Sequence, residues 1–168
     1  LYSIVLLLSP AFISIAIGCI MGIPINGVLM VIPFLFLRKF SGGFHAKHAC
    51  TCFVGSSILV TVFLWISTKI NSGLLLYMVT AISVVGLCIF SPIQSDNRII
   101  EENEKHTYRK IVMRQLATYV VVAIIADIVG KEIVTICMFL GIIIMVVMQV
   151  PCLIGGGNWG IIVTCKQF

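Results

Sequence analysis

Long apolar stretches, separated by short polar segments, decide what this chain can fold into. Six of them are candidate membrane spans, and they lie at roughly residues 2–22, 24–37, 50–68, 73–92, 111–129 and 133–153. A helix needs about 20 mostly apolar residues to cross the hydrocarbon core of a bilayer. Only 10% of the residues are charged, whereas soluble domains carry about 25%. The sequence therefore predicts an all-α, polytopic membrane bundle of about six helices, in a single domain over residues 1–168.

The first two spans differ from the others in their flanking or internal residues. The first, within residues 1–23, is too long for a signal-peptide core and has no basic residues before it, so we expect a true span. The chain starts at Leu1 without a methionine, and we expect further sequence before it. The second span is shorter and contains Pro24 and Pro33. Because proline kinks or breaks a helix interior, we expect this span to be short or kinked.

The basic residues predict the orientation of the chain in the membrane. With six spans, nine of the eleven lysines and arginines fall on one side, and only Lys69 and Lys131 fall on the other. Since cytoplasmic loops carry the excess of Lys and Arg, the loops at about 38–49 and 93–110 and both termini are expected in the cytoplasm. The net charge of +5 comes mostly from these loops, so it does not indicate nucleic-acid binding.

One short polar segment, residues 38–52, combines His45, His48, Cys50 and Cys52 at the edge of a membrane span. A histidine near a cysteine is the minimum set of groups for a thiolate nucleophile. On one continuous helix His48 and Cys52 would be neighbours, and His45 would lie about 10 Å from Cys52 along the axis. On spacing alone, these four residues can equally be interfacial polar groups and plain packing.

The glycine pair Gly42-Gly43 permits a second geometry. If the backbone breaks there and a helix begins near His48, His45 can fold back over the first turn of that helix. Cys52 would then lie near the positive end of the helix, which lowers the pKa of a thiol. The spacing alone leaves both His45 and His48 open as the base.

Two other function classes compete with an enzyme. Two histidines and two cysteines within eight residues can bind zinc or copper, although the usual spacer between ligand pairs is missing. A small transporter would place polar residues in mid-span, where few occur besides Asp127, which we expect to pair with Lys131 four residues on. The alternative is therefore a small membrane transporter or a metal-binding membrane protein that uses the His/Cys cluster. The odd number of cysteines, seven, does not favour a disulfide framework.

The second polar segment, residues 94–110, is acidic first and then basic. Its basic end contains Lys105, Arg109 and Lys110. These side chains can hold an acidic peptide tail or lipid headgroups. A solvated loop whose charges only orient the chain is the simpler interpretation.

Both polar segments resemble those of the accessory gene regulator protein B (AgrB) family, integral-membrane cysteine endopeptidases of bacterial quorum sensing. In the first segment the matching residues are Arg38, Gly42, Gly43, His45, Ala46 and Cys52. In the second they are Ser91-Pro92 and Asp96-Asn97-Arg98, followed by the acidic and then basic residues. The resemblance covers the order of spans from about residue 1 to residue 150.

The resemblance implies that Cys52 is the nucleophile and His45 the general base. We expect Arg38, Gly42, Gly43 and His48 to support these two catalytic residues. The expected substrate is a propeptide with an amphipathic N-terminal helix and an acidic tail, which Lys105, Arg109 and Lys110 would hold. The enzyme would cut it on the cytoplasmic side of a bacterial plasma membrane and close the product into a cyclic thiolactone or lactone. No metal or cofactor is needed, the lipid bilayer is the surrounding partner, and a homodimer is compatible with the chain.

Overall fold

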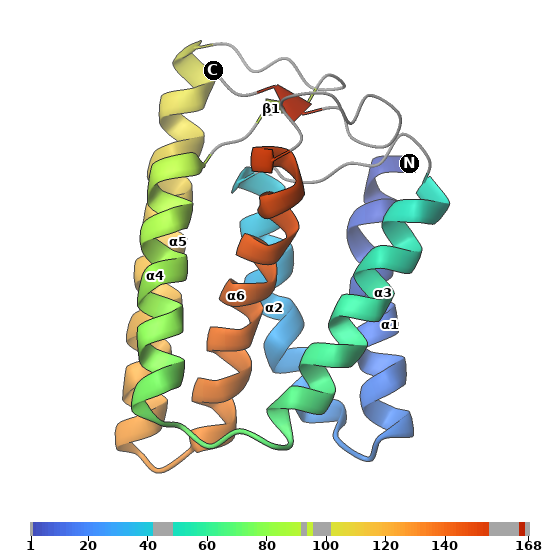
Figure 1. Ribbon diagram of the computed structural model, residues 1–168, viewed down its shortest axis with the longest axis vertical. Coiled ribbons are helices and arrows are strands. Elements are labelled where there is room, and N and C mark those ends of the chain that lie inside the picture. The colour runs from blue at the N-terminus through green and yellow to red at the C-terminus, as the bar shows by residue number, and fades with distance from the viewer. Residues whose placement is uncertain (1, 42–48, 92–93, 96–101, 155–164, 167–168) are drawn as a thin grey trace.

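Helices that alternate in direction make up the bundle (Figure 1). The computed structural model describes residues 2–41, 49–91, 94–95, 102–154 and 165–166. The helices in this part of the chain are α1 (Tyr2–Ile20), α2 (Pro24–Ser41), α3 (Ala49–Ser67), α4 (Leu74–Phe90), α5 (Glu102–Ile128) and α6 (Glu132–Ile154). Two short strands, β1 (Gln94–Ser95) and β2 (Cys165–Lys166), pair antiparallel at one end. The predicted all-α membrane bundle is confirmed.

The outer surface of the bundle is strongly apolar. Large hydrophobic side chains stay exposed on every helix with described side chains, and Phe12 and Ile20 of α1 are 71% and 85% exposed. Such a surface suits lipid, where a helix satisfies its backbone hydrogen bonds internally. Within the described part of the chain, three helical segments are long and apolar enough to cross a membrane: Pro24–Ser41, His106–Ile128 and Glu132–Val150. Shorter apolar helices cover Pro10–Ile20, Val54–Ser67 and Leu74–Phe90.

Two helices are longer than the sequence predicts. The second span, predicted to end at residue 37, continues to Ser41, with Arg38 and Lys39 in its last turn. Basic residues there complement the negative end of the helix dipole. Helix α5 begins at Glu102, so residues 102–110, which were assigned to a loop, are helical. Glu, Lys and Arg are good helix formers, and acidic residues favour a helix N-terminus.

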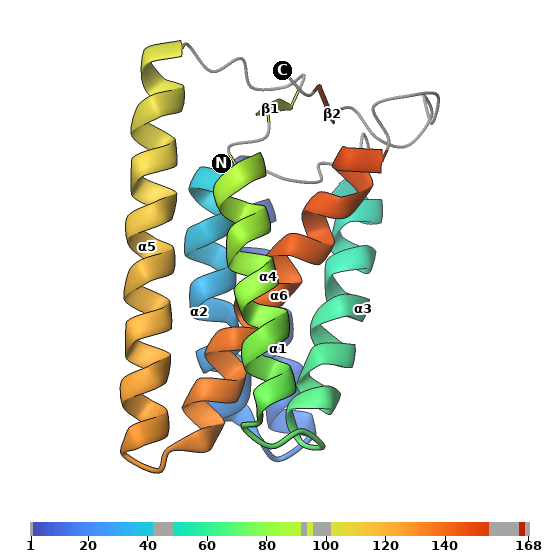
Figure 2. The same ribbon diagram turned by 60° about the vertical axis from the view of Figure 1, so that its left-hand side comes forward.

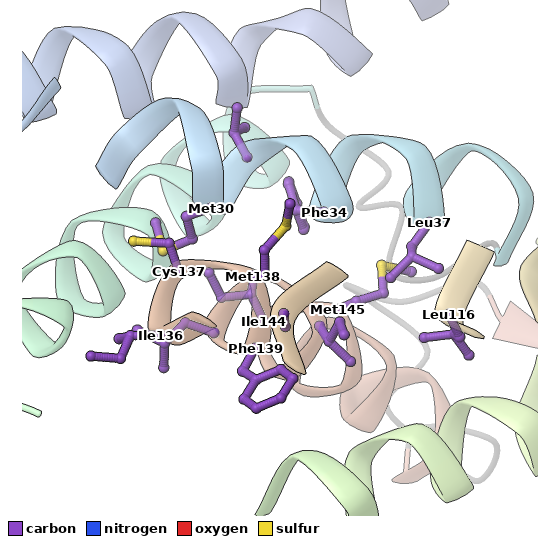
Figure 3. Packing of buried hydrophobic residues seen from close by; sticks show 14 of the residues in the cluster. Met30, Phe34, Leu37, Leu116, Ile136, Cys137, Met138, Phe139, Ile144 and Met145 are labelled. Atoms are coloured by element: carbon purple, nitrogen blue, oxygen red, sulfur yellow. The ribbon is translucent and has the colours of Figure 1, made fainter. Parts of the chain in front are cut away.

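Helix α6 is the centre of the bundle. It packs against α2, α3, α4 and α5, and α1 covers the far side of α2 (Figure 2). The side chains of Met30, Phe34 and Leu37 on α2 lie over Cys137, Met138 and Met145 of α6 (Figure 3). Helix α6 therefore connects α2 with α3, α4 and α5.

Glycine permits a close helix contact between α2 and α6. A Cβ atom on Gly141 would lie 2.5 Å from both the Met30 carbonyl oxygen and Pro33 Cγ. Small residues let helix backbones approach closely inside membranes. Pro33, expected to weaken α2, is therefore part of its main packing surface.

Replacing Gly141 with Ala is expected to destabilise the bundle, because the added methyl group forces α2 and α6 apart. Overpacking of this kind costs about 1–3 kcal/mol. Gly86→Ala is the matched control, because a Cβ atom at this helical position meets nothing within 4 Å. Thermal unfolding of both variants in detergent micelles checks this. Equal midpoints for the two variants would contradict the close contact.

Candidate active site

The helix ends that flank the two polar segments lie at the same end of the bundle. The alternating directions bring the final residues of α2, α4 and α6 to the end where α3 and α5 begin (Figures 1 and 2). Ser41, Ala49, Ser91 and Glu102 therefore share one end, as expected if both loops lie on one side of the membrane. Which side is cytoplasmic stays a prediction.

Two described helices flank the motif. Helix α2 ends at Ser41 and α3 begins at Ala49, and the seven residues between them lie outside the described part of the chain. Cys50 and Cys52 lie in the first turn of α3, where the positive end of the helix dipole favours a thiolate. Gly42, Gly43, His45 and His48, and the side chains of both cysteines, lie outside the described residues. The roles predicted for them stay predictions.

Arg38 is a buried cation near this end. It lies in the last turn of α2, is only 9% exposed, and its guanidinium carbon is 5.5 Å from the centroid of the Phe34 ring. A buried charge is costly unless its surroundings compensate for it, and a cation over an aromatic face supplies part of that compensation. Lys39 beside it is exposed. Arg38, which is predicted to support the catalytic residues, therefore lies buried at the end of the bundle and not in a solvated loop.

A buried polar cluster joins three helices at the same end. Gln149 Nε2 on α6 donates to Ser41 Oγ at 2.5 Å and to Ser91 Oγ at 3.2 Å, and it lies 3.5 Å from the Ser41 carbonyl oxygen. The two serine hydroxyls also share a hydrogen bond. Ser41 is the last residue of α2, and Ser91 caps the end of α4. We name Ser41, Ser91 and Gln149 the end cluster.

The sequence analysis missed the end cluster. Its members are 50, 58 and 108 positions apart, so no local pattern connects them. One signal was available: Gln149 is an uncharged polar residue inside the apolar run that forms α6. An amide in such a place requires hydrogen-bond partners from another helix.

The predicted substrate-binding residues lie on the first part of α5. Arg109 and Lys110 are exposed, while the side chain of Lys105 is outside the described part. Arg109 Nη2 also donates to the Cys88 carbonyl oxygen at 3.2 Å, in the last turn of α4. Arginine near a helix C-terminus satisfies a carbonyl that has no partner within the helix. Arg109 thus has a structural contact in addition to its predicted role.

Asp127 has a different partner from the one predicted. Tyr77 Oη on α4 donates to Asp127 Oδ2 at 2.7 Å, at the opposite end of the bundle from the end cluster (Figure 1). The expected pairing with Lys131 was wrong, because a tertiary contact from α4 takes the place of the local one. The carboxylate therefore belongs to a contact between helices.

The metal-binding alternative remains untested. Among the residues that the structure describes, no group of three His, Cys, Asp or Glu side chains is arranged to hold a metal ion. The cluster from His45 to Cys52 was not part of that search, because its side chains lie outside the described residues.

Comparisons with known proteins identify the family. The family model described as Accessory gene regulator B matches residues 1–150. A curated relative, "Accessory gene regulator protein B" of Staphylococcus saprophyticus subsp. saprophyticus, is 22% identical over 121 residues, which is 71% of this chain. The aligned region spans 62% of that relative, less than two thirds of its length. No solved structure matches the chain. The family match includes both polar segments and almost all of α6, so the chain belongs to the accessory gene regulator B family.

Proposed function

We propose that this protein is a membrane-embedded cysteine endopeptidase that processes a propeptide into a cyclic quorum-sensing signal peptide. The observation that carries the proposal is the position of Cys52 in the first turn of α3, at the bundle end that also holds the buried Arg38. Family membership supports the assignment. In this proposal Cys52 is the nucleophile and His45 is the base.

The reaction requires a thiolate. A free thiol has a pKa of about 8.5 and is mostly protonated at neutral pH. A neighbouring imidazole and a helix N-terminus both favour the ionised form. The thiolate of Cys52 attacks the scissile carbonyl, and a C–S bond forms. The imidazolium of His45 then protonates the leaving amine as the C–N bond breaks, which leaves a thioester on Cys52.

The second step closes the ring. A thiol or hydroxyl within the bound peptide gives its proton to His45, which became neutral in the first step, and attacks the thioester carbonyl. The C–S bond to Cys52 breaks, and the Cys52 thiolate leaves beside the imidazolium. The product is a cyclic thiolactone or lactone, and the peptide has undergone acyl transfer without net hydrolysis of this bond. Backbone N–H groups at Gly42 and Gly43 are the proposed donors for the developing oxyanion. Neither step requires an oxidant, a metal or a cofactor.

Reconstitution tests the proposal. The purified protein is placed in liposomes with a candidate propeptide that has an amphipathic N-terminal helix, an internal Cys or Ser and an acidic tail. Mass spectrometry should find a thioester-linked peptide on Cys52 that hydroxylamine removes, together with a cyclic product. Intact propeptide and no adduct, across the candidates with these features, would reject an endopeptidase and favour the transporter or metal-binding alternative.

The basic start of α5 is proposed to hold the acidic tail of the substrate. Replacing Lys105, Arg109 and Lys110 together with Gln should raise the apparent KM for the propeptide several-fold. Exposed ion pairs are worth under about 1 kcal/mol each, so single changes should have small effects. The defect should shrink at high salt, where these attractions are screened even in the unchanged protein.

The matched control is the double change of Lys69 and Lys131 to Gln. Both residues are exposed and lie at the opposite end of the bundle. This control removes basic charge without affecting the proposed contact, and its KM should stay unchanged. If the triple variant cleaves normally at low salt and limiting substrate, the basic start of α5 only anchors the chain.

A further inference from the structure

We propose that Gln149 is a positioning residue for acyl transfer, acting through Ser41 and Ser91 on the two polar segments that leave the bundle at this end. The inference rests on the proposed function. Gln149 is 2% exposed and Ser41 is completely buried. Their contacts are therefore protected from competition with water.

The end cluster fixes where the first polar segment begins. Ser41 is the last helical residue of α2, and Gly42-Gly43 and His45 follow it in the sequence. Gln149 Nε2 approaches both the hydroxyl and the carbonyl oxygen of Ser41. The side chain and the backbone of this residue are thus tied to α6, which packs against α2, α3, α4 and α5. Gly42 and Gly43, which follow in the sequence, have no side chains to restrict the backbone, so the restraint at this point comes from Ser41.

The same amide fixes where the second polar segment begins. Ser91 ends α4 with its backbone N–H on the Leu87 carbonyl oxygen at 2.9 Å, and its hydroxyl accepts from Gln149. The Ser41–Ser91 hydrogen bond completes a triangle. One side chain on the central helix therefore sets the separation between the starts of both segments.

Such an arrangement matters for catalysis because the proposed nucleophile and the proposed base belong to different parts of the sequence. Cys52 lies on α3, whereas His45 follows Ser41, the last residue of α2, by four positions. A misplacement of about 1 Å between reacting groups can reduce a rate by about a hundredfold. The hydrogen bonds of Gln149 would thus act on the reaction without Gln149 touching the substrate.

The experiment separates positioning from stability with two variants. Gln149→Met keeps the length of the side chain but removes the amide donor, so that Ser41 and Ser91 keep only the hydrogen bond between their own hydroxyls. The triple variant Ser41→Ala, Ser91→Ala, Gln149→Met removes every polar side-chain group of the cluster. An apolar replacement of all partners is nearly neutral for stability, whereas a partly unsatisfied cluster is destabilising. The triple variant should therefore recover the melting temperature that Gln149→Met loses.

Three readouts are measured for each variant in liposomes: kcat and KM for the propeptide, the pH dependence of Cys52 alkylation by iodoacetamide, and the thermal midpoint. We expect kcat to fall by about 10- to 100-fold in both variants with KM nearly unchanged. The Cys52 thiolate should also form at a higher pH in both. Thr135→Val is the control, because it removes another buried hydrogen bond of α6, from Thr135 Oγ1 to the Ala123 carbonyl oxygen at 2.9 Å. It should affect only the thermal midpoint.

The outcomes are distinguishable. If Cys52 of the unchanged protein alkylates like an ordinary thiol and the protein cuts no propeptide, the proposed function is wrong. This inference is then wrong as well. If the unchanged protein is active and Gln149→Met matches it in kcat and alkylation, the positioning role is wrong while the function stands. Recovery of kcat together with the melting temperature in the triple variant also overturns positioning, because the cluster would then only stabilise the fold.

Discussion

Cys52→Ala is expected to abolish propeptide processing, whereas Cys50→Ala should leave most of it. Both residues lie in the first turn of α3. Successive helical residues are about 100° apart around the axis, so positions 50 and 52 of a helix are separated by roughly 200°. The two cysteines are therefore not expected to be interchangeable. The seven-residue offset from His45 that the family resemblance implies selects Cys52.

The measurement is propeptide cleavage in liposomes, followed by mass spectrometry. Cys52→Ser should also be inactive at neutral pH. A serine hydroxyl stays protonated at this pH and is a weak nucleophile unless a stronger base removes its proton. Cys50→Ala serves as the matched control, since it removes a thiol from the same helical turn. Equal insertion and thermal midpoints in both alanine variants exclude a folding defect. Loss of cleavage in Cys50→Ala alone would assign the nucleophile to Cys50.

The existence and order of the helices could be predicted because the apolar runs are long and the segments between them are short. In a bilayer, an apolar run of this length has few alternatives to a helix. The ends of the helices were harder to predict. Residues 38–41 and 102–110 are charged or polar apart from Phe40, so a hydropathy argument stops before them. Their backbone nevertheless continues the helix, because Glu, Lys and Arg are good helix formers.

Contacts between distant segments could not be predicted. A local rule paired Asp127 with Lys131, yet the carboxylate accepts from Tyr77, which is 50 positions away. The end cluster has the same origin, since Gln149 meets Ser41 only after α6 has packed against α2. Spacing does not encode such contacts because they depend on the rotation of one helix against another. The two polar segments, by contrast, could be identified because polar residues are conspicuous in an apolar chain.

His45→Ala is expected to remove cleavage and the reactivity of Cys52 at neutral pH, while His48→Ala should retain most of both. The assignment of the base to His48 depended on one continuous helix, which would place His48 and Cys52 four residues apart on one face. Helix α2 ends at Ser41 and α3 begins at Ala49, and His45 and His48 lie between them, outside the described residues. The choice of His45 rests on the family resemblance and stays a prediction.

The alkylation rate of Cys52 as a function of pH distinguishes the two histidines without any substrate. With the base in place, a thiolate–imidazolium pair keeps the thiol reactive well below its ordinary pKa of about 8.5. Without the base, reactivity should appear only as the pH approaches that value. We expect this shift in His45→Ala and only a small one in His48→Ala. A full shift in His48→Ala, with His45→Ala unchanged, would assign the role of base to His48. His48 immediately precedes α3, so it would then have to lie over the first turn of that helix.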